Sequence, residues 1–378
     1  MIINNVKLVL EDEVINGSLE VQDGRISAFA ESQSRLAEAI DGEGGWLLPG
    51  LIELHTDNLD KFFTPRPKVD WPAHSAMSSH DALMVASGIT TVLDAVAIGD
   101  VRDGGDRLEN LEKMINAVEE TQKRGLNRAE HRLHLRCELP HHTTLPLFEK
   151  LVGREPVSMV SLMDHSPGQR QYADRSKYRD YYQGKYHLTN EEMDKFEEEQ
   201  MALAAAWSQP NRQRIAAICR ERNIALASHD DATCEHVLES RQLGSVIAEF
   251  PTTIAAAQAS RQHGMSVLMG APNIVRGGSH SGNVAAHHLV ASGLLDILSS
   301  DYYPASLLDA AFRIADDEGN AFTLAQAIRL VSKNPAQALG LHDRGAIAEG
   351  KRADLVLARR HGEHIHIDHV WRQGKRVF

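Results

Sequence analysis

The chain has 378 residues, of which 42% are hydrophobic and 24% are charged, and its formal net charge is -12. This length suits an α/β barrel with a small accessory domain, and the composition is ordinary for a soluble globular protein. The acidic balance argues against nucleic acid or a membrane as the main partner, although a local basic cluster could still bind a small anion. The three widely spaced cysteines predict neither a disulfide framework nor a Cys-x-x-Cys zinc motif, and they favour a reducing cytoplasm.

Both ends of the chain have the pattern of strands joined by tight turns. Near the N-terminus, "NNVKLVLEDEVINGSLEVQDGRISAF" alternates apolar and polar residues, and its Asn16-Gly17 and Asp23-Gly24 pairs are hairpin turn signals. Near the C-terminus, "ADLVLARRHGEHIHIDHVWRQGKRV" alternates in the same way, with a turn near Gly362. We expect residues 1–48 and 339–378 to form one small β-sandwich domain. The first residues have no basic head or continuous apolar core, so we expect no signal peptide, and no apolar run is long enough to span a membrane.

The middle of the chain, residues 49–338, alternates short apolar runs with amphipathic stretches such as "RLENLEKMINAVEETQKRG". The strand candidates are "LIELH", "TTVLDAV", "RLHLRCEL", "VSMVSLMDH", "IALASHD", "SVIAEF", "SVLMGAP" and "LDILSSD". Eight strands with helices between them predict a TIM-like (β/α)₈ barrel. A doubly wound sheet is the alternative, but no G-x-G-x-x-G follows an early strand.

An insertion interrupts this alternation near residues 167–210. Its first part, "PGQRQYADRSKYRDYYQGKY", is rich in Arg, Lys and Tyr and follows a strand end, where barrel enzymes place active-site loops. Its second part starts with Thr189 and has Glu192 three residues on, which is a capping-box pattern. We therefore expect a helix from this point.

Polar side chains that can bind a metal follow the apolar runs at the ends of several expected strands. They are His55, Asp57, Glu138, His165, His229 and Asp301. Residues at the carboxyl ends of barrel strands converge on one mouth, where burying them unpaired would be costly. A divalent cation removes that cost, so we predict a metal site with one or two ions. Zn²⁺ is favoured, and Mn²⁺ and Mg²⁺ remain open.

Other histidines fit an ordinary structural role better. His364 and His366 alternate with isoleucines and predict the wet face of an edge strand. The pairs His141-His142 and His287-His288 are expected to lie on the surface or to contact a metal ligand without binding the metal. His80 lies in an expected helix and receives no role.

Two segments could bind an anion, although a solvated turn or loop is the alternative for each. In "GAPNIVRGGSHSGN", Gly277 and Gly278 allow a tight turn, Ser279 and His280 offer donors, and Arg276 adds charge. A helix is expected to start here, in "VAAHHLVASG", and loop amides at a helix N-terminus form an anion site. The Pro-rich segment "FFTPRPKVDWP" carries Arg66 and Lys68 shortly after the predicted metal pair.

Several segments together resemble the amidohydrolase superfamily. They are "LLPGLIELHTD", "GITTVLD", "NPAQALGL" and "RGAIAEGKRADLVL", and the resemblance covers essentially the whole chain. It implies a metal-dependent hydrolase barrel with a small β-domain. Two features differ from the common pattern. Asp57 stands where the usual first-strand motif has a second His, and no strand-end Lys is present to bridge two metals, so Glu138 is the expected substitute.

The segments "HTDNLDKFFTPRPKVDWP", "DHSPGQRQY" and "GAPNIVRGGSHSGN" narrow the resemblance to superfamily members that act in bacterial phosphonate breakdown. It implies hydrolysis of the small phosphorylated sugar α-D-ribose 1-methylphosphonate 5-triphosphate, with release of diphosphate. Asp301 would accept the proton of the attacking water. The implied phosphate-binding candidates are Arg66, Lys68, Arg170, Arg276, Gly277, Gly278, Ser279 and His280.

Two other functions are compatible with the sequence. A conventional member of the superfamily would hydrolyse a C–N bond at the same site, and a scaffold barrel would have no activity. A homo-oligomer is also compatible with the sequence.

Overall fold

A computed structural model describes residues 1–99, 106–279 and 281–378, without the side chains of residues 106–109. It confirms the predicted barrel: eight parallel strands pair in chain order from β6 to β13. They are β6 (Leu51–Thr56), β7 (Ile89–Ile98), β8 (Glu130–Glu138), β9 (Val157–Met163), β10 (Ala225–His229), β11 (Ile247–Glu249), β12 (Ser266–Gly270) and β13 (Ile297–Ser299). Backbone hydrogen bonds from Asp57 N to Asp301 O and from Asp301 N to His55 O, both 3.1 Å, join the first strand to the end of the last.

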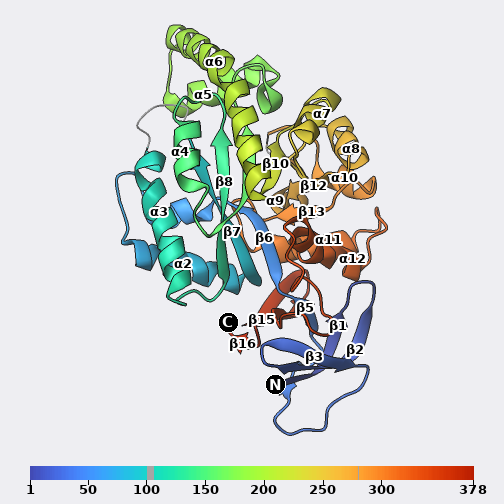
Figure 1. Ribbon diagram of the computed structural model, residues 1–378. Coiled ribbons are helices and arrows are strands. Elements are labelled where there is room, and N and C mark those ends of the chain that lie inside the picture. Colours follow the sequence, from blue (N-terminus) through green and yellow to red (C-terminus); the bar gives the residue numbers. More distant parts are fainter. Residues whose placement is uncertain (100–105, 280) are drawn as a thin grey trace.

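Helices follow the strands and cover the outside of the barrel (Figure 1). They are α1 (Asn58–Phe63), α2 (Ala73–Ala86), α3 (Asp106–Lys123), α4 (Thr144–Leu151), α5 (Arg175–Tyr186), α6 (Asn190–Arg222), α7 (Cys234–Gln242), α8 (Ile254–Gln262), α9 (Ala271–Arg276), α10 (Ala286–Ala291), α11 (Ser306–Asp316), α12 (Leu324–Arg329) and α13 (Lys333–Ala338). Side chains such as Leu54, Leu93 and Met159 pack together in one core cluster. Other strand residues, such as Val92 and Leu133, pack in clusters with the helices. Burial on both faces explains why most of these strands are rich in apolar residues, and β8, with its charged and histidine side chains, is the exception.

The two ends of the chain share a second sheet, as expected. Its strands are β1 (Ile2–Val9), β2 (Val14–Gln22), β3 (Arg25–Ala30), β4 (Ile40–Asp41), β5 (Trp46–Pro49), β14 (Leu355–His361), β15 (His364–Arg372) and β16 (Lys375–Arg376). Hydrogen bonds join them into one continuous, mostly antiparallel sheet in which β14 pairs with β5. In Figure 1, the blue and red ends of the chain meet in this lower part of the molecule.

The turn predicted at Asn16-Gly17 is wrong, because both residues lie inside β2. A Cβ atom on Gly17 would lie 1.8 Å from the carbonyl oxygen of Ala30 in the neighbouring strand. Gly17 therefore allows two strands to approach closely, and it does not form a turn. The turn at Asp23-Gly24 is confirmed, with positive φ at both residues.

The insertion forms a short 3₁₀ turn (Arg170–Tyr172) followed by α5 and the 33-residue α6, which stands highest in Figure 1. The predicted capping box is present: the hydroxyl of Thr189 accepts from the backbone of Glu192, whose carboxylate accepts from the backbone of Thr189. Tyr172, Tyr178 and Phe196 belong to an aromatic core cluster of this insertion.

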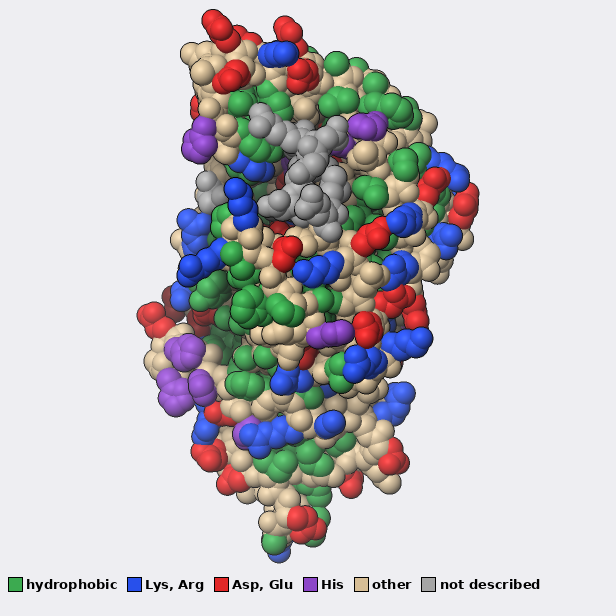
Figure 2. All heavy atoms as spheres, turned by 90° about the vertical axis from the view of Figure 1, so that its left-hand side faces the viewer, with side chains coloured by type: hydrophobic (Ala, Val, Ile, Leu, Met, Phe, Trp, Pro, Cys, Tyr) green, Lys and Arg blue, Asp and Glu red, His purple; other side chains and the backbone are tan. Residues whose placement is uncertain are grey.

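Figure 2 shows basic and acidic side chains interspersed over one face of the molecule. This mixture differs from the one-sided positive surface that nucleic-acid binding requires. Among the described residues, no helix is long and apolar enough to cross a membrane.

Candidate metal centre

Three residues at the ends of barrel strands have a left-handed backbone conformation. Asp230 directly follows β10, Phe250 directly follows β11, and Asp301 lies two residues after β13. Their φ angles are 56°, 55° and 54°. Non-glycine residues rarely adopt this left-handed region, and such residues cluster at functional sites. The ends of these strands are therefore specialised positions of the barrel.

The first group of predicted ligands converges where the first and last strands meet. Ligand atoms of His55, Asp57 and Asp301 all lie within 4.8 Å of one another. His55 is 1% exposed, whereas Asp57 is 36% exposed, and His55 Nε2 lies 3.7 Å from Asp57 Oδ1. A buried imidazole nitrogen thus faces two carboxylates at the edge of solvent.

A second group lies beside it and contains one residue that the sequence analysis missed. His165, His229 and Asp230 also bring ligand atoms within 4.8 Å of one another. Asp230 Oδ2 lies 3.5 Å from His165 Nε2 and 3.4 Å from His229 Nε2. Asp230 directly follows His229, so the acidic pair in "SHDD" was the available signal. The predicted ligand Glu138 contacts His165 instead, at 2.5 Å from Nδ1, which favours an orienting role over the expected bridge between metals.

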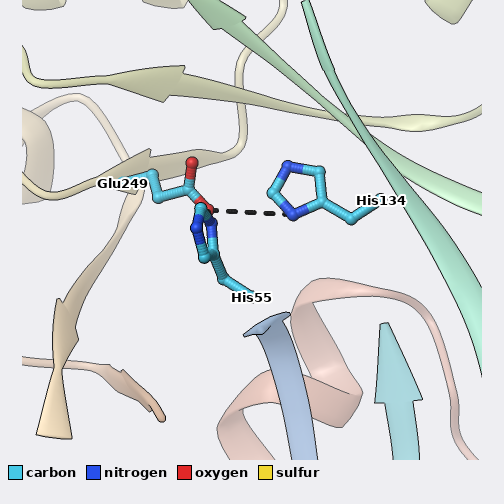
Figure 3. A group of neighbouring side chains, drawn as sticks. All are labelled: His55, His134 and Glu249. Carbon is cyan, nitrogen blue, oxygen red and sulfur yellow. Dashed lines mark hydrogen bonds and ion pairs between the residues drawn. The ribbon is translucent and has the colours of Figure 1, made fainter. Parts of the chain in front are cut away.

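The buried carboxylate of Glu249, at the end of β11, links the two groups. Its Oε1 accepts from His55 Nδ1 at 2.6 Å, and its Oε2 accepts from His229 Nδ1 at 2.8 Å. Figure 3 shows His55 and His134 converging on this side chain. With both Nδ1 atoms occupied, the Nε2 lone pairs of His55 and His229 are left for a metal. A second-shell carboxylate commonly fixes metal-binding histidines in this way.

Two further polar residues of the barrel were missed, His134 and Arg136. They alternate with Glu138 along β8, while Leu133, Leu135 and Cys137 pack outward, so the period-2 pattern was the available signal. His134 Nδ1 donates to Leu54 O at 3.1 Å and Nε2 pairs with Ser161 Oγ at 2.9 Å. Because both nitrogens are used, His134 is a structural neighbour of the site. Arg136 Nη1 donates to Asp57 Oδ1 at 2.7 Å, and both residues line a pocket.

The electrostatics of the site favour a cation. Burial disfavours charge on His55, but the carboxylates of Glu249 and Asp57 together outweigh it and raise the pKa of His55 to about 10. Burial also opposes charge on His165, yet Glu138 raises the pKa of His165 to about 10. The field that holds protons on these two imidazoles would equally stabilise a metal ion.

A third carboxylate stabilises the barrel next to the site. The fully buried Glu53 accepts from His55 N at 2.7 Å and from Ser300 N at 2.6 Å. Burial raises the pKa of Glu53 to about 7. These two hydrogen bonds tie the segment that carries His55 to the segment that carries Asp301.

The donor set fits a divalent metal. Each group combines imidazole nitrogen with carboxylate oxygen, which are ligands of Zn²⁺ and also suit Mn²⁺. Five of the six predicted ligands fall into the two groups, and the sixth, Glu138, contacts one of them. The shared contact of His55 and His229 with Glu249 makes the two groups neighbours, so one or two ions can be held.

The predicted phosphate-binding residues differ in their positions. Arg170 is 5% exposed and pairs with Asp231 and Glu239, which disfavours a contact with phosphate, and its assignment stays a prediction. These partners lie 61 and 69 residues away in the chain. Arg66 and Lys68 are exposed in the loop after α1, and they stay predictions.

The glycine-rich segment also differs from expectation. Gly277 caps the C-terminus of α9, with a φ of 81°, and the next helix starts only at Ala286. The expected helix is present, but the two glycines lie at the C-terminus of α9, where the partial charge is negative. The anion site at the N-terminus of α10 stays a prediction. Arg276 is exposed here, Gly278 and Ser279 stay predictions, and His280 lies outside the described residues.

A second histidine cluster lies between α2 and the strands β7 and β8. His80 Nε2 and His131 Nδ1 contact the two oxygens of Asp94 at 2.6 and 2.7 Å, and His131 Nε2 contacts Asp81 at 3.0 Å. All four side chains are buried. Carboxylates only accept hydrogen bonds, so His131, which lies between two of them, is an imidazolium.

The barrel, with side chains at its mouth that can bind a metal, defines a metal-dependent hydrolase of the barrel class. The chain belongs to the amidohydrolase family, whose model matches residues 84–378. Over its full 378 residues it is 84% identical to the alpha-D-ribose 1-methylphosphonate 5-triphosphate diphosphatase of Escherichia coli (strain K12), with 100% of both chains covered.

Solved structures with low sequence identity share the fold. The N-acetylglucosamine-6-phosphate deacetylase of Thermotoga maritima superimposes with a TM-score of 0.61 at 16% identity, covering 100% of this chain and 99% of that one. The 5-methylcytosine deaminase of Klebsiella pneumoniae gives a TM-score of 0.65 at 15% identity, covering 100% and 97%. These likenesses establish the amidohydrolase barrel with its small β-domain.

Proposed function

We propose that this protein hydrolyses α-D-ribose 1-methylphosphonate 5-triphosphate to the 5-phosphate and diphosphate, as a step of phosphonate catabolism. The observation that carries the proposal is the 84% identity over the full length to the E. coli diphosphatase. The mouth of the barrel supports it, because nitrogen and carboxylate ligands lie beside exposed cations there. We propose Zn²⁺ as the metal. The three cysteines are free, which supports a cytoplasmic location.

Different residues at the mouth have different roles in phosphoryl transfer. A divalent cation held by the His55 and His229 groups would supply Lewis acidity, lowering the pKa of a water and neutralising phosphate charge. Asp301 is placed beside these groups to accept the proton of the attacking water. Arg136 orients Asp57 through the 2.7 Å contact. Attack at the α-phosphorus then releases diphosphate.

Two exposed cations meet at Tyr302, the residue after Asp301, and we propose that they bind the departing diphosphate. Lys61 Nζ donates to the carbonyl oxygen of Tyr302 at 3.2 Å, and Arg276 Nη1 lies 3.5 Å from its hydroxyl. Lys61 was missed in the sequence because it lies inside α1, where an exposed lysine is unremarkable. Lys177 of α5 lies near the glycine-rich segment instead, because a Cβ atom on Gly282 would lie 3.7 Å from its Nζ.

Hydrolysis in ¹⁸O-water tests the bond that is cleaved. Attack at the α-phosphorus should place the label in the 5-monophosphate and none in diphosphate. Label in diphosphate would mean attack at the β-phosphorus. Turnover of a cyclic amide without any phosphate product would favour C–N bond hydrolysis instead.

A two-enzyme, two-substrate comparison tests the role of Arg276. Replacing Arg276 with Ala removes a charged contact, worth about 1.5–3 kcal/mol, so kcat/KM for the triphosphate should fall roughly ten- to a hundredfold. The loss should be smaller for the corresponding diphosphate substrate, which lacks the terminal phosphate. Strictly additive effects of the variant and the shortened substrate would show that Arg276 does not contact that phosphate.

A further inference from the structure

The hairpin of β14 and β15 carries three exposed histidines around its turn. His361 pairs directly with His364, and Gly362 turns the chain between them with a φ of 64°. Residues paired across two strands project to the same face, and so does the residue two positions further along a strand. His361, His364 and His366 therefore project from one face of this hairpin. The sequence pattern had indicated only a solvated strand face.

The three rings are already close together. The ring centroid of His366 lies 6.0 Å from that of His361 and 6.0 Å from that of His364. All three residues are exposed, so solvent surrounds their side chains and rotation toward a common ion displaces no packed neighbour. Ligating nitrogens need to reach about 2.0–2.1 Å from Zn²⁺, which rotation about the Cα–Cβ and Cβ–Cγ bonds can provide.

A carboxylate stands next to these rings. Asp368 Oδ1 lies 3.7 Å from His366 Nε2, and the other oxygen of Asp368 accepts from Arg359 Nε at 2.5 Å. Asp368 lies at the β-bulge of this strand, and its contacts with His366 and Arg359 place its carboxylate beside the histidines. Its first oxygen can act as a fourth donor while Arg359 holds the side chain in place.

We propose that His361, His364 and His366 form a second metal site, specific for borderline transition metals such as Zn²⁺, Ni²⁺ or Cu²⁺. Imidazole is the preferred donor for these ions, whereas Mg²⁺ prefers oxygen. The site belongs to the small sheet, separate from the mouth of the barrel, and it does not depend on the proposed function. An ion bound here would link β14 to β15 next to the turn.

Calorimetric titration of the holoenzyme with Ni²⁺ at pH 8 tests this site, because imidazole must be deprotonated to bind a metal. Wild type should bind one additional ion per chain. His366→Asn should bind it at least tenfold more weakly, because even the loss of a second-shell partner costs about 10–100-fold. Excess Mg²⁺ should not displace the ion, and the hydrolytic activity of the variant should equal that of wild type.

The exposed pair His287 and His288 on α10 provides a matched control, because their ring centroids lie 4.2 Å apart outside the hairpin. The double variant His287→Asn/His288→Asn should keep the additional ion at wild-type affinity. Unchanged Ni²⁺ affinity in His366→Asn would overturn the proposal. So would displacement by Mg²⁺, or a loss of the ion in the control variant alone.

Discussion

The molecule contains two clusters of buried histidines and carboxylates that differ in how their polar atoms are used. At the mouth, Glu249 occupies only one nitrogen each of His55 and His229, and the other nitrogens face carboxylates across a shared space. Between α2 and the barrel, His131 has both nitrogens on carboxylates. Both clusters bring potential metal ligands within 4.8 Å of one another.

This comparison shows that residue type and proximity do not define a metal site. The buried cluster alternates negative and positive groups, with Asp81 and Asp94 on either side of the His131 imidazolium. Arg128, which contacts Asp81 at 3.2 Å, supplies a second positive charge, so these charges compensate one another without a metal ion. The mouth combines fixed histidine orientations with lone pairs that point to a common space, and it lies beside the partly exposed Asp57. We therefore expect catalysis to depend on the mouth and stability to depend on the buried cluster.

The largest expected effect is on catalysis, from replacing Asp301 with Asn. The variant keeps the shape and tolerates the left-handed backbone, but it loses the proton acceptor and one negative charge. kcat should fall on the order of a thousandfold, while the urea midpoint of unfolding stays near that of wild type. Steady-state kinetics and urea titration measure the two quantities. A variant that keeps wild-type metal content and most of its kcat would refute the role of Asp301.

The next effect concerns stability, from replacing Asp94 with Asn in the buried cluster. His131 would lose one of its two carboxylates in a fully buried setting. The free energy of unfolding should fall by about 3 kcal/mol, the lower end for a broken buried ion pair because Asp81 remains. Urea unfolding measures this loss, and kcat per folded molecule should not change. Lost activity with intact stability would instead give the cluster a catalytic role.

A smaller effect is expected from replacing Glu249 with Gln. His55 Nδ1 and His229 Nδ1 contact different oxygens of Glu249, and a glutamine would present a donor NH2 group to one of them. Metal affinity should fall about 10–100-fold, as measured by competition with a chelator. Glu239→Gln is the control, because Glu239 pairs with Arg170 and Arg212. Equal metal affinity in both variants would show that Glu249 does not orient the ligands.

The smallest effect is a pH dependence of stability. Burial opposes charge on His131, but Asp94 and Asp81 together outweigh it and raise the pKa of His131 from 6.5 to about 9. A group with a raised folded-state pKa stabilises fully below its unfolded pKa, and this contribution is lost as the pH rises through the folded value. The difference in unfolding free energy between wild type and Asp94→Asn should therefore shrink from about pH 6.5 to about pH 9. A constant difference would mean that His131 is neutral.

The sequence predicts the strands well and identifies candidate ligands that the fold brings together, because both leave local signals. Each ligand candidate follows an apolar run, and the ends of parallel strands must meet at one mouth. Glu249 was missed because one Glu at the end of "SVIAEF" looks like any strand terminator, although its partners come from two other strands. His80, Asp94 and His131 show no common pattern, since their contacts join a helix to two strands.

The unexpected partners of Arg170 and the wrong turn at Gly17 have the same physical origin as these omissions. Arg170 carries a charge in a segment suited to the active site, but Asp231 and Glu239 neutralise it in the folded chain. The role of Gly17 depends on the backbone of β3, which no turn rule can include. Local sequence fixes what a residue can do, and tertiary partners decide which of these roles it performs.

Anomalous scattering from crystals of the active enzyme, without added metal, tests the central claim most directly. The account predicts metal density at the mouth, in contact with His55 Nε2 or with the nitrogens of His165 and His229. Density between His80, Asp94 and His131, with none at the mouth of an active enzyme, would contradict it.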